Sequence, residues 1–236
     1  MTLQNTTVLI TGANRGLGKA LVSAFLQADV ERVYAASRHP DHLDNSDNRV
    51  TPVLLDVCDP ASIQQLAERV TKLDVLINNA GVLTFGDILS DSEADLDHCL
   101  DVNLKGVWRL SRALLPALSS SHNGRICNIL SLLSLASMPG LSAYNLSKAA
   151  AWSATLSLRA SLQPRGIQVH GVFPGAIDTD MTASMDVDKA PPEAIAEDII
   201  QGLLEGREDI YPGPAEEVYQ LWRSDHKAVE RLFAGV

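Results

Sequence analysis

Short apolar segments alternate with longer amphipathic segments along most of the chain, and this alternation limits the fold more than any other feature. The apolar segments have the length of β-strands and cover residues 7–11, 32–37, 49–57, 73–80, 124–131 and 167–175. Between them, apolar residues recur at helical spacing, as in GKALVSAFLQA and ASIQQLAERVTK. Strands that alternate with helices form right-handed βαβ units and a parallel sheet that is covered on both faces. The sequence therefore predicts a doubly wound α/β fold.

Several finer features follow from the same pattern. Pro52 cannot donate a ladder hydrogen bond, so the third strand is expected at an edge of the sheet. One long helix is predicted within residues 92–120, and another runs through residues 142–163 and ends near Pro164 and Gly166. Residues 209–236 are interpreted as a short seventh strand followed by a helical tail.

Composition sets broad limits on what the protein does. The chain has 236 residues, of which 46% are hydrophobic and 20% are charged, which fits one domain over residues 1–236. Its formal net charge of -10 argues against nucleic acid or an anionic membrane as the main partner. The N-terminal sequence lacks the basic region of a signal peptide, and no apolar run approaches the ~18 to 20 residues of a membrane span. We expect a cytoplasmic protein.

The cysteines and histidines give no indication of a metal site. Cys58, Cys99 and Cys127 have no metal-ligand spacing, and reduced thiols are the expected state. His39 and His42 fall in a polar loop, where solvated side chains are expected.

The segment TGANRGLG, residues 11–18, joins the first strand to the first helix. Gly12 allows a tight turn, Gly16 lets the backbone approach a pyrophosphate, and Gly18 permits close contact between helix and strand. The spacing Gly-x-x-x-Gly-x-Gly differs from the more common Gly-x-Gly-x-x-Gly of dinucleotide-binding turns. A tight turn with incidental glycines is the alternative, and a dinucleotide site is the favoured interpretation.

The end of the second strand indicates which dinucleotide binds. An acidic residue at this point would hold the ribose 2′-hydroxyl of NAD, but the chain has Ser37 and Arg38 there. A guanidinium binds the 2′-phosphate of NADP, and Arg15 adds a second cation on the same side. The alternative is that both arginines are ordinary surface charges. NADP(H) is the predicted cofactor.

Tyr144 and Lys148 lie four residues apart at the start of the helix predicted after residue 142, so their side chains share one face. A nearby cation favours the phenolate, by up to ~4 kcal/mol at about 4 Å and an effective dielectric near 20. This would lower the pKa of Tyr144 toward the range useful for acid–base catalysis. The spacing also arises by chance, so the pair alone is a weak indication.

Taken in order, the glycine turn, the segment NNAG and the Tyr-x-x-x-Lys pair resemble the short-chain dehydrogenase/reductase family, over about residues 5–181. The resemblance implies a Rossmann fold with a seven-stranded parallel sheet and an NADP-preferring oxidoreductase. It also implies a catalytic tetrad of Asn103, Ser131, Tyr144 and Lys148, in which Tyr144 is the acid–base. Ser134 is an alternative for the serine, although its offset from Tyr144 differs from the family pattern.

The same resemblance assigns the residues that contact cofactor and substrate. The cofactor-binding residues are Gly12, Asn14, Arg15, Gly16, Leu17, Gly18, Ser37, Arg38, Asp56, Val57, Asn79, Ala80, Gly81, Tyr144, Lys148, Pro174, Gly175, Ile177 and Thr179. The substrate-binding residues are Ser131, Leu133, Tyr144, Ala176, Met181 and Met185. A mobile lid is expected at about residues 176–195.

The function expected from these features is NADPH-dependent reduction of a ketone or aldehyde to an alcohol. Two alternatives are a non-catalytic NADP(H)-binding regulator and an epimerase or dehydratase that retains the nicotinamide. The charged, aromatic C-terminal tail differs from the glycine-rich end that many family members use in tetramers. A homodimer formed through residues 92–120 and 142–163 is therefore expected, with a tetramer as the alternative.

Overall fold

The computed structural model describes residues 2–236, and these form a seven-stranded, fully parallel sheet with strand order β3-β2-β1-β4-β5-β6-β7. The strands are β1 (Thr7–Thr11), β2 (Arg32–Ser37), β3 (Val50–Leu54), β4 (Val75–Asn78), β5 (Arg125–Ile129), β6 (Gln168–Val172) and β7 (Asp209–Ile210). The predicted doubly wound α/β fold is confirmed. β3 lies at one edge of the sheet, as Pro52 predicts.

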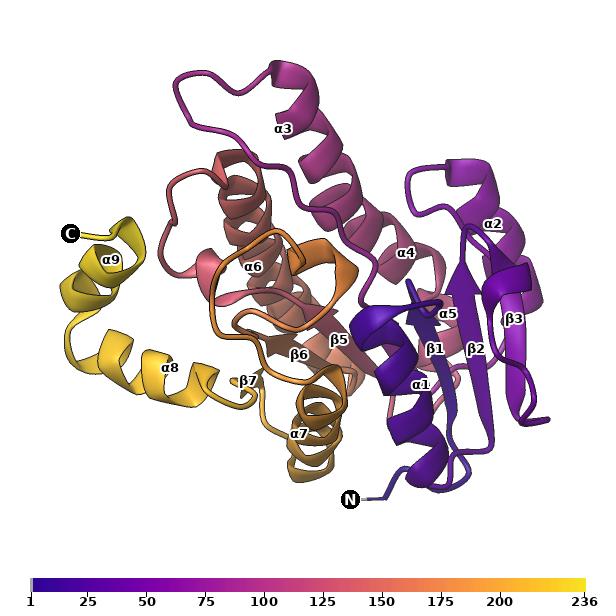
Figure 1. Ribbon diagram of the computed structural model, residues 1–236. Coiled ribbons are helices and arrows are strands. Elements are labelled where there is room, and N and C mark those ends of the chain that lie inside the picture. The colour runs from indigo at the N-terminus through magenta and orange to yellow at the C-terminus, as the bar shows by residue number, and fades with distance from the viewer. Residues whose placement is uncertain (1) are drawn as a thin grey trace.

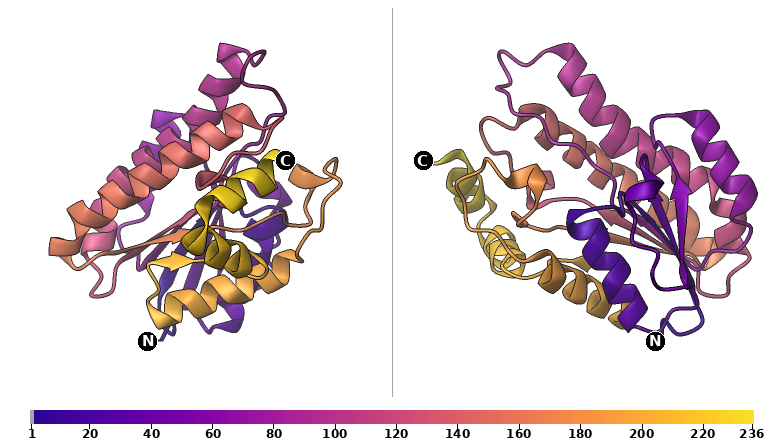
Figure 2. Two further views of the ribbon diagram at one scale, coloured as in Figure 1. Left: turned by 90° about the vertical axis from the view of Figure 1, so that its left-hand side faces the viewer. Right: turned by 45° about the vertical axis from the view of Figure 1, so that its right-hand side comes forward.

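Helices cover both faces of the sheet (Figures 1 and 2). The α-helices are α1 (Gly16–Gln27), α2 (Pro60–Arg69), α3 (Glu93–Leu100), α4 (Val107–Ala113), α5 (Leu115–Ser119), α6 (Ser142–Leu162), α7 (Pro192–Glu205), α8 (Ala215–Ser224) and α9 (His226–Ala234). The shorter 3-10 and π segments are η1 (Pro40–His42), η2 (Asp101–Gly106), η3 (Leu132–Ser134), η4 (Gln163–Arg165) and η5 (Asp180–Thr182).

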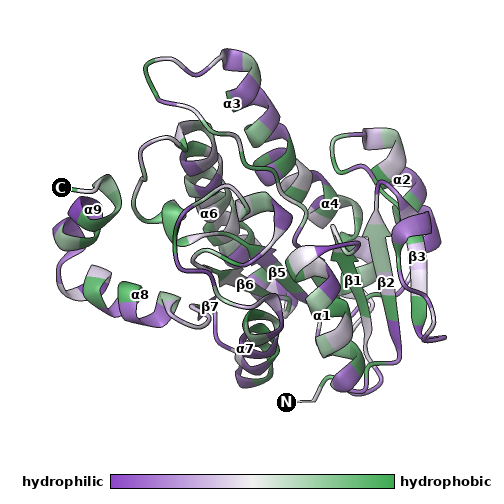
Figure 3. Cartoon of the chain, viewed as in Figure 1, coloured by the Kyte–Doolittle hydropathy of each residue, from purple (hydrophilic) through white to green (hydrophobic). Residues whose placement is uncertain are grey.

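Two apolar cores hold these layers together. On one face, Phe25 of α1 and Ile199 of α7 are buried in the same cluster as Ile10 of β1. On the other face, Leu66 of α2 and Leu110 of α4 are buried with neighbouring strand residues. The central strands are apolar along nearly their whole length (Figure 3). This continuous burial is typical of a parallel sheet with both faces covered.

The long helix predicted within residues 92–120 is confirmed, and the structure adds a π-helical segment and a break to it. Helix α3 continues into the π-helical segment η2, then into α4, and α5 follows after a break at Leu114. Pro116 explains the break, because proline lacks the N–H that a continuing helix requires. Single π turns in a helix are frequent at functional sites, and this one contains Asn103.

The proposed lid and the C-terminal tail follow β6. A loop closes on itself at residues 176–190, where Ala190 N donates to Ala176 O (3.0 Å) and Asp178 N donates to Ala190 O (2.9 Å). Helix α7 begins at Pro192, so the last residues of the proposed lid fall in the first turn of that helix. The tail of β7, α8 and α9 lies at the β7 side of the sheet, far from β3 (Figure 1).

Candidate active site

A cavity of about 690 Å³ lies at the carboxyl ends of the strands, where parallel sheets of this kind bind ligands. All nineteen residues that the sequence assigns to cofactor binding line it, from Gly12 in the glycine turn to Thr179 near η5. The sequence pattern therefore selects residues that are distant along the chain and adjacent in space.

The glycine turn has the geometry that a dinucleotide requires. Gly12 and Gly16 have positive φ angles of 65° and 52°, which side chains of L-residues disfavour. A Cβ atom on Gly18 would lie 2.1 Å from Gly12 O and 2.7 Å from Asn79 Nδ2. Helix α1 begins at Gly16, so its N-terminal amides face the cavity and suit a pyrophosphate. These residues fit a dinucleotide phosphate.

Asn79 connects the glycine turn to the end of β4. Its Nδ2 donates to Thr11 O (2.8 Å) and to Gly12 O (3.3 Å), and the Thr11 hydroxyl accepts from Ala80 N (2.9 Å). These hydrogen bonds fix the two loops that flank the cavity between β1 and β4.

Cations and a carboxylate gather at the adenosine end of the cavity. Arg38 lines it beside Ser37, and Asp56 Oδ1 accepts from Cys58 N (2.9 Å). Arg15 Nη1 lies 3.1 Å from Asp180 Oδ2, in a pair whose side chains are 68% and 75% exposed. The sequence did not predict this contact, which joins the glycine turn to η5 across the cavity mouth.

Ser131, Tyr144 and Lys148 meet at the other end of the cavity. Ser131 follows β5 and makes a hydrogen bond with the Tyr144 hydroxyl. Lys148 is 5% exposed, and its Nζ donates to Ile129 O (2.7 Å) at the end of β5. The Lys148 Nζ lies 5.6 Å from the centre of the Tyr144 ring. The rival serine, Ser134, lies in η3 with its hydroxyl buried.

Asn103 supports this cluster from η2. Its Oδ1 accepts from Val82 N, and its Nδ2 donates to Val82 O and to Ser147 Oγ, each at 2.9 Å. The Ser147 hydroxyl in turn donates to Tyr144 O (2.8 Å). Asn103 is 1% exposed and thus links the π segment, the loop after β4 and helix α6.

In the protein by itself, burial outweighs the expected lowering of the Tyr144 pKa by Lys148. Withdrawal of the phenol from solvent raises the pKa of Tyr144 to about 12, and the hydrogen bond to Ser131 opposes that rise. The same loss of solvation lowers the pKa of Lys148 to about 8. Attraction between the two groups favours their charged forms, but burial of both side chains disfavours those forms.

Only some of the predicted substrate-binding residues line the cavity. Met181 lines the cavity and is partly exposed, whereas Leu133, Ala176 and Met185 lie outside its lining. Ala176 is part of the closed base of the loop, and Met185 N donates to Thr182 O (2.9 Å) beyond η5. Turns of the backbone determine which of these side chains reach the cavity, and the sequence motifs do not predict those turns.

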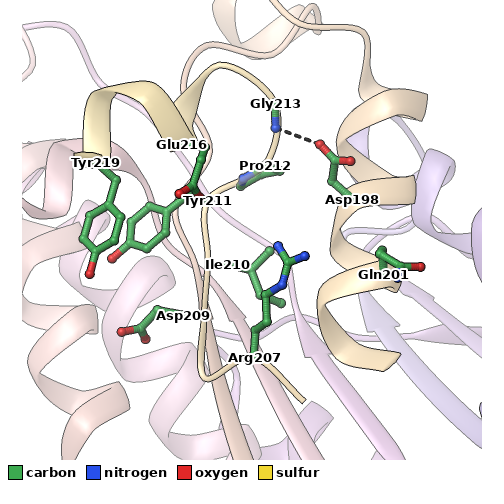
Figure 4. Close-up of a pocket in the computed structure, with 10 residues that line it drawn as sticks. All are labelled: Asp198, Gln201, Arg207, Asp209, Ile210, Tyr211, Pro212, Gly213, Glu216 and Tyr219. Atoms are coloured by element: carbon green, nitrogen blue, oxygen red, sulfur yellow. Dashed lines mark hydrogen bonds between the residues drawn. The ribbon is translucent and has the colours of Figure 1, made fainter. Parts of the chain in front are cut away.

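A second hollow, of about 650 Å³, lies between α7 and the β7–α8 connection (Figure 4). Its lining includes Asp198, which accepts a hydrogen bond from Gly213 N (2.7 Å), together with Arg207, Asp209 and Glu216. It lies apart from Ser131, Tyr144 and Lys148. The first cavity is therefore the one that combines a phosphate-binding turn with titratable groups.

Some residues of the site were not anticipated from the sequence. Ser147, Asp180, His39 and His42 contact or line it, and each lies within a few residues of a predicted site residue. Proximity to a motif was the only available signal. Among residues 2–236, no group of three or more His, Cys, Asp or Glu side chains is arranged to hold a metal ion. Within the same residues, no helix combines the length and apolarity that crossing a membrane requires.

Comparison with known proteins agrees with this geometry. Residues 6–190 match the family model for short chain dehydrogenase. The oxidoreductase UcpA of Salmonella typhimurium is 33% identical over 213 residues, covering 85% of this chain and 81% of its own. The 3-oxoacyl-acyl-carrier-protein reductase FabG of Thermotoga maritima is 32% identical over 232 residues, covering 94% and 90%.

Solved structures show the same relationship. A short chain dehydrogenase from Burkholderia cenocepacia in complex with NADP superimposes with a TM-score of 0.93 at 31% identity, covering 99% of each chain. The protein described here belongs to the short-chain dehydrogenase family. It is an oxidoreductase of that family.

Proposed function

We propose that the protein reduces a ketone or aldehyde to an alcohol, reversibly, with Tyr144 as the general acid and base. The observation that carries this proposal is the meeting of Ser131, Tyr144 and Lys148 at one end of the cavity whose other end begins at the glycine turn. Hydrogen-bond donors fixed before the reaction stabilise charge as it develops on a carbonyl oxygen.

Each residue has a distinct part in this reaction. NADPH held by the residues that line the cavity would supply the hydride for the carbonyl carbon. Ser131 donates a hydrogen bond to the substrate oxygen, and Tyr144 gives that oxygen its proton. The ammonium of Lys148 lowers the free energy of the phenolate that remains, and Asn103 holds the surrounding backbone in place through Val82 and Ser147.

A pKa of about 12 keeps the Tyr144 phenol protonated at neutral pH, and transfer of its proton requires that the phenolate left behind be stabilised. Reduction, which needs Tyr144 protonated at the start, agrees with that value. Regeneration of the phenol requires a proton from solvent, and Lys148, with a pKa of about 8, is suited to pass one at neutral pH.

The substrate class is proposed from the lining near Tyr144. Leu83, Leu130 and Met181 are apolar and line the cavity, which favours a substrate with an apolar or aromatic part. The loop of residues 176–190 carries Met181 and is proposed to close over the bound substrate.

The experiment that tests this function measures NADPH and NADH oxidation by the purified protein against aldehydes, aryl ketones, diketones and ketoesters. Turnover with NADPH well above that with NADH supports the proposal. Tight NADPH binding without turnover of any panel member contradicts it and supports the non-catalytic regulator. Interconversion of a sugar or hydroxy compound with no net change in NADPH supports an enzyme that retains its nicotinamide.

We further propose a homodimer that pairs α4 and α6 with the same helices of a second copy. Trp108 of α4 and Leu146 and Leu156 of α6 are large apolar side chains that are 44–48% exposed. Analytical ultracentrifugation tests this proposal: a dimer that dissociates when Trp108 and Leu156 are both replaced by Asp supports it. A dimer or tetramer unaffected by the pair of substitutions contradicts it.

A cytoplasmic location is also proposed, because Cys58, Cys99 and Cys127 are all free thiols. Cell fractionation tests it, and recovery in a membrane or secreted fraction contradicts it.

A further inference from the structure

His39 and His42 lie at the adenosine rim of the cavity and not in a solvated loop away from it. Both line the cavity beside Ser37 and Arg38, and their ring centres are 5.6 Å apart. The rings are exposed on their other sides. Their position next to the end of β2 was invisible in the sequence, because it depends on how the chain turns after Arg38.

A short turn fixes the two rings relative to each other. The His39 amide donates to Ser37 Oγ (3.0 Å), which ties the turn to the buried end of β2. His42 N donates to His39 O (3.2 Å) and Leu43 N donates to Pro40 O (3.0 Å), closing η1. Pro40 also restricts φ in the first turn. The turn therefore presents two imidazoles side by side at the same rim.

Basic side chains gather at this rim. The chain carries a formal net charge of -10, yet Arg15, Arg38, His39 and His42 all line this end of the cavity. The other titratable groups near the pair are on η1 and the following loop, α1, the β3–α2 connection and η5: Asp41, Asp44, Lys19, Asp56, Cys58 and Asp180.

Three of these acidic groups have other partners. Asp180 is engaged by Arg15, and Asp56 Oδ1 accepts from Cys58 N. Asp44 accepts from Ser46 N (3.0 Å), in the loop beyond η1. The guanidinium of Arg38 and the two neighbouring imidazoles can therefore all donate hydrogen bonds to an anionic ligand at this rim.

We propose that His39 and His42, together with Arg38, bind the 2′-phosphate of NADP, and that their protonation makes the preference for NADP over NAD depend on pH. The proposal rests on the assignment of Arg38 to that phosphate. A phosphate monoester loses its second proton near pH 6, so it carries close to two negative charges at pH 7 and above. Imidazole is the side chain whose charge changes between pH 5 and 8.

The pH dependence follows from these two titrations. A phosphate keeps its charge above pH 7, whereas an imidazole that loses its proton no longer makes a charge-assisted hydrogen bond to it. NAD has an uncharged hydroxyl at this position, so its affinity should not respond to pH in this way. Binding of NADP at pH 7.5 should therefore draw protons onto the imidazoles.

The test is calorimetric titration of the purified protein with NADP⁺ and with NAD⁺ at pH 6.5, 7.5 and 8.5. At pH 7.5 it is repeated in two buffers of different ionisation enthalpy, which reports protons taken up on binding. We expect the ratio of NADP⁺ to NAD⁺ affinity to fall on the order of tenfold between pH 6.5 and 8.5. Proton uptake is expected with NADP⁺ and not with NAD⁺.

Variants separate this proposal from the one on which it rests. The double variant His39→Gln/His42→Gln should lose both the pH dependence and the proton uptake, whereas His122→Gln, an exposed histidine before β5, should keep them. Arg38→Gln should lower the ratio at every pH and leave its pH dependence intact.

Three outcomes would overturn the proposal. An equal loss of NADP⁺ and NAD⁺ affinity in the double variant would place the rings against the adenine. An unchanged pH dependence in that variant would assign the titration to the phosphate alone. If neither Arg38→Gln nor the double variant changes the ratio of NADP⁺ to NAD⁺ affinity, the 2′-phosphate does not bind at this rim. The assignment of Arg38 to that phosphate would then also be wrong.

Discussion

The two ends of the cofactor cavity are built on different physical principles. At the catalytic end, Lys148 and Asn103 are 5% and 1% exposed, and each makes a hydrogen bond to backbone of another element. At the adenosine end, Arg15, Arg38 and His39 are exposed, and the Arg15–Asp180 pair is open to solvent.

This difference predicts how each end responds to change. A buried polar group that loses its partner pays the full cost of desolvation, so single substitutions at the catalytic end should have large effects. Interactions between solvent-exposed charges are screened, and each contributes little. Substitutions at the adenosine end should therefore have small, additive effects on cofactor affinity that depend on salt concentration. The substitutions below test that contrast.

Tyr144→Phe should have the largest effect. It removes the only atom of this side chain that can transfer a proton, so the turnover rate should fall by about 10²- to 10⁴-fold. NADP⁺ binding by calorimetry should change little, because the ring remains. Tyr34→Phe on β2, which lies outside the cavity, is the matched control. Turnover within a few-fold of the unmodified protein would remove Tyr144 from the reaction.

Lys148→Met should alter how stability depends on pH. Burial lowers the pKa of Lys148 from 10.5 to about 8 in the folded protein. Between pH 8 and 10.5 the unfolded chain therefore binds a proton that the folded protein does not, so the lysine becomes less destabilising as pH rises. Relative to the variant, the unmodified protein should gain up to about 3 kcal/mol in its free energy of unfolding across this range.

Urea unfolding at pH 7.5, 9.0 and 10.5 measures this gain as the difference between the two proteins. The pKa of Tyr144 is raised in the folded state, which lowers stability above pH 10 in both proteins and cancels in the difference. Lys72→Met, an exposed lysine before β4, should show no such trend. A pH-independent difference would mean that Lys148 keeps an ordinary pKa.

The sequence predicts the buried end of the molecule better than the exposed end. A strand that is buried on both faces requires a continuous run of apolar residues, which is visible in the sequence. The close contact of Gly18 with Gly12 O leaves no room for a side chain, so this position requires glycine. The tetrad residues and the glycine turn are recognisable for the same reason. Pro52 marks the sheet edge because a missing N–H is also a strict requirement.

What the sequence could not predict depends on backbone turns and on solvation. The π segment around Asn103 is made of residues that an α-helix would also accommodate. The sequence therefore does not reveal that this turn contains an extra residue. Met185 and Leu133 lie outside the cavity because of turns at η5 and η3. The raised pKa of Tyr144 depends on the depth of the hydroxyl, which only the assembled fold determines.

Arg38→Asp should have an intermediate effect. It replaces a cation at the rim by an anion, so the ratio of NADPH to NADH efficiency should fall by about 10- to 100-fold, mostly through the KM for NADPH. Arg69→Asp makes the same change of charge at the exposed end of α2 and should leave the ratio unchanged. Steady-state kinetics with both cofactors measures it. An unaltered ratio would show that Arg38 is an ordinary surface charge.

Asp180→Asn should have the smallest effect, and it tests whether the rim is truly governed by screened charges. The substitution breaks the exposed pair with Arg15 and removes one negative charge near the bound phosphates. NADP⁺ affinity should therefore rise, by less than about threefold at low salt, and the gain should shrink as salt is added. Asp186→Asn, an exposed change further along the same loop, is the control. A tenfold or greater loss of affinity would mean that the Arg15–Asp180 contact orders the loop of residues 176–190. Single substitutions would then have large effects at the adenosine end as well as at the catalytic end, and the proposed difference between the two ends would be wrong.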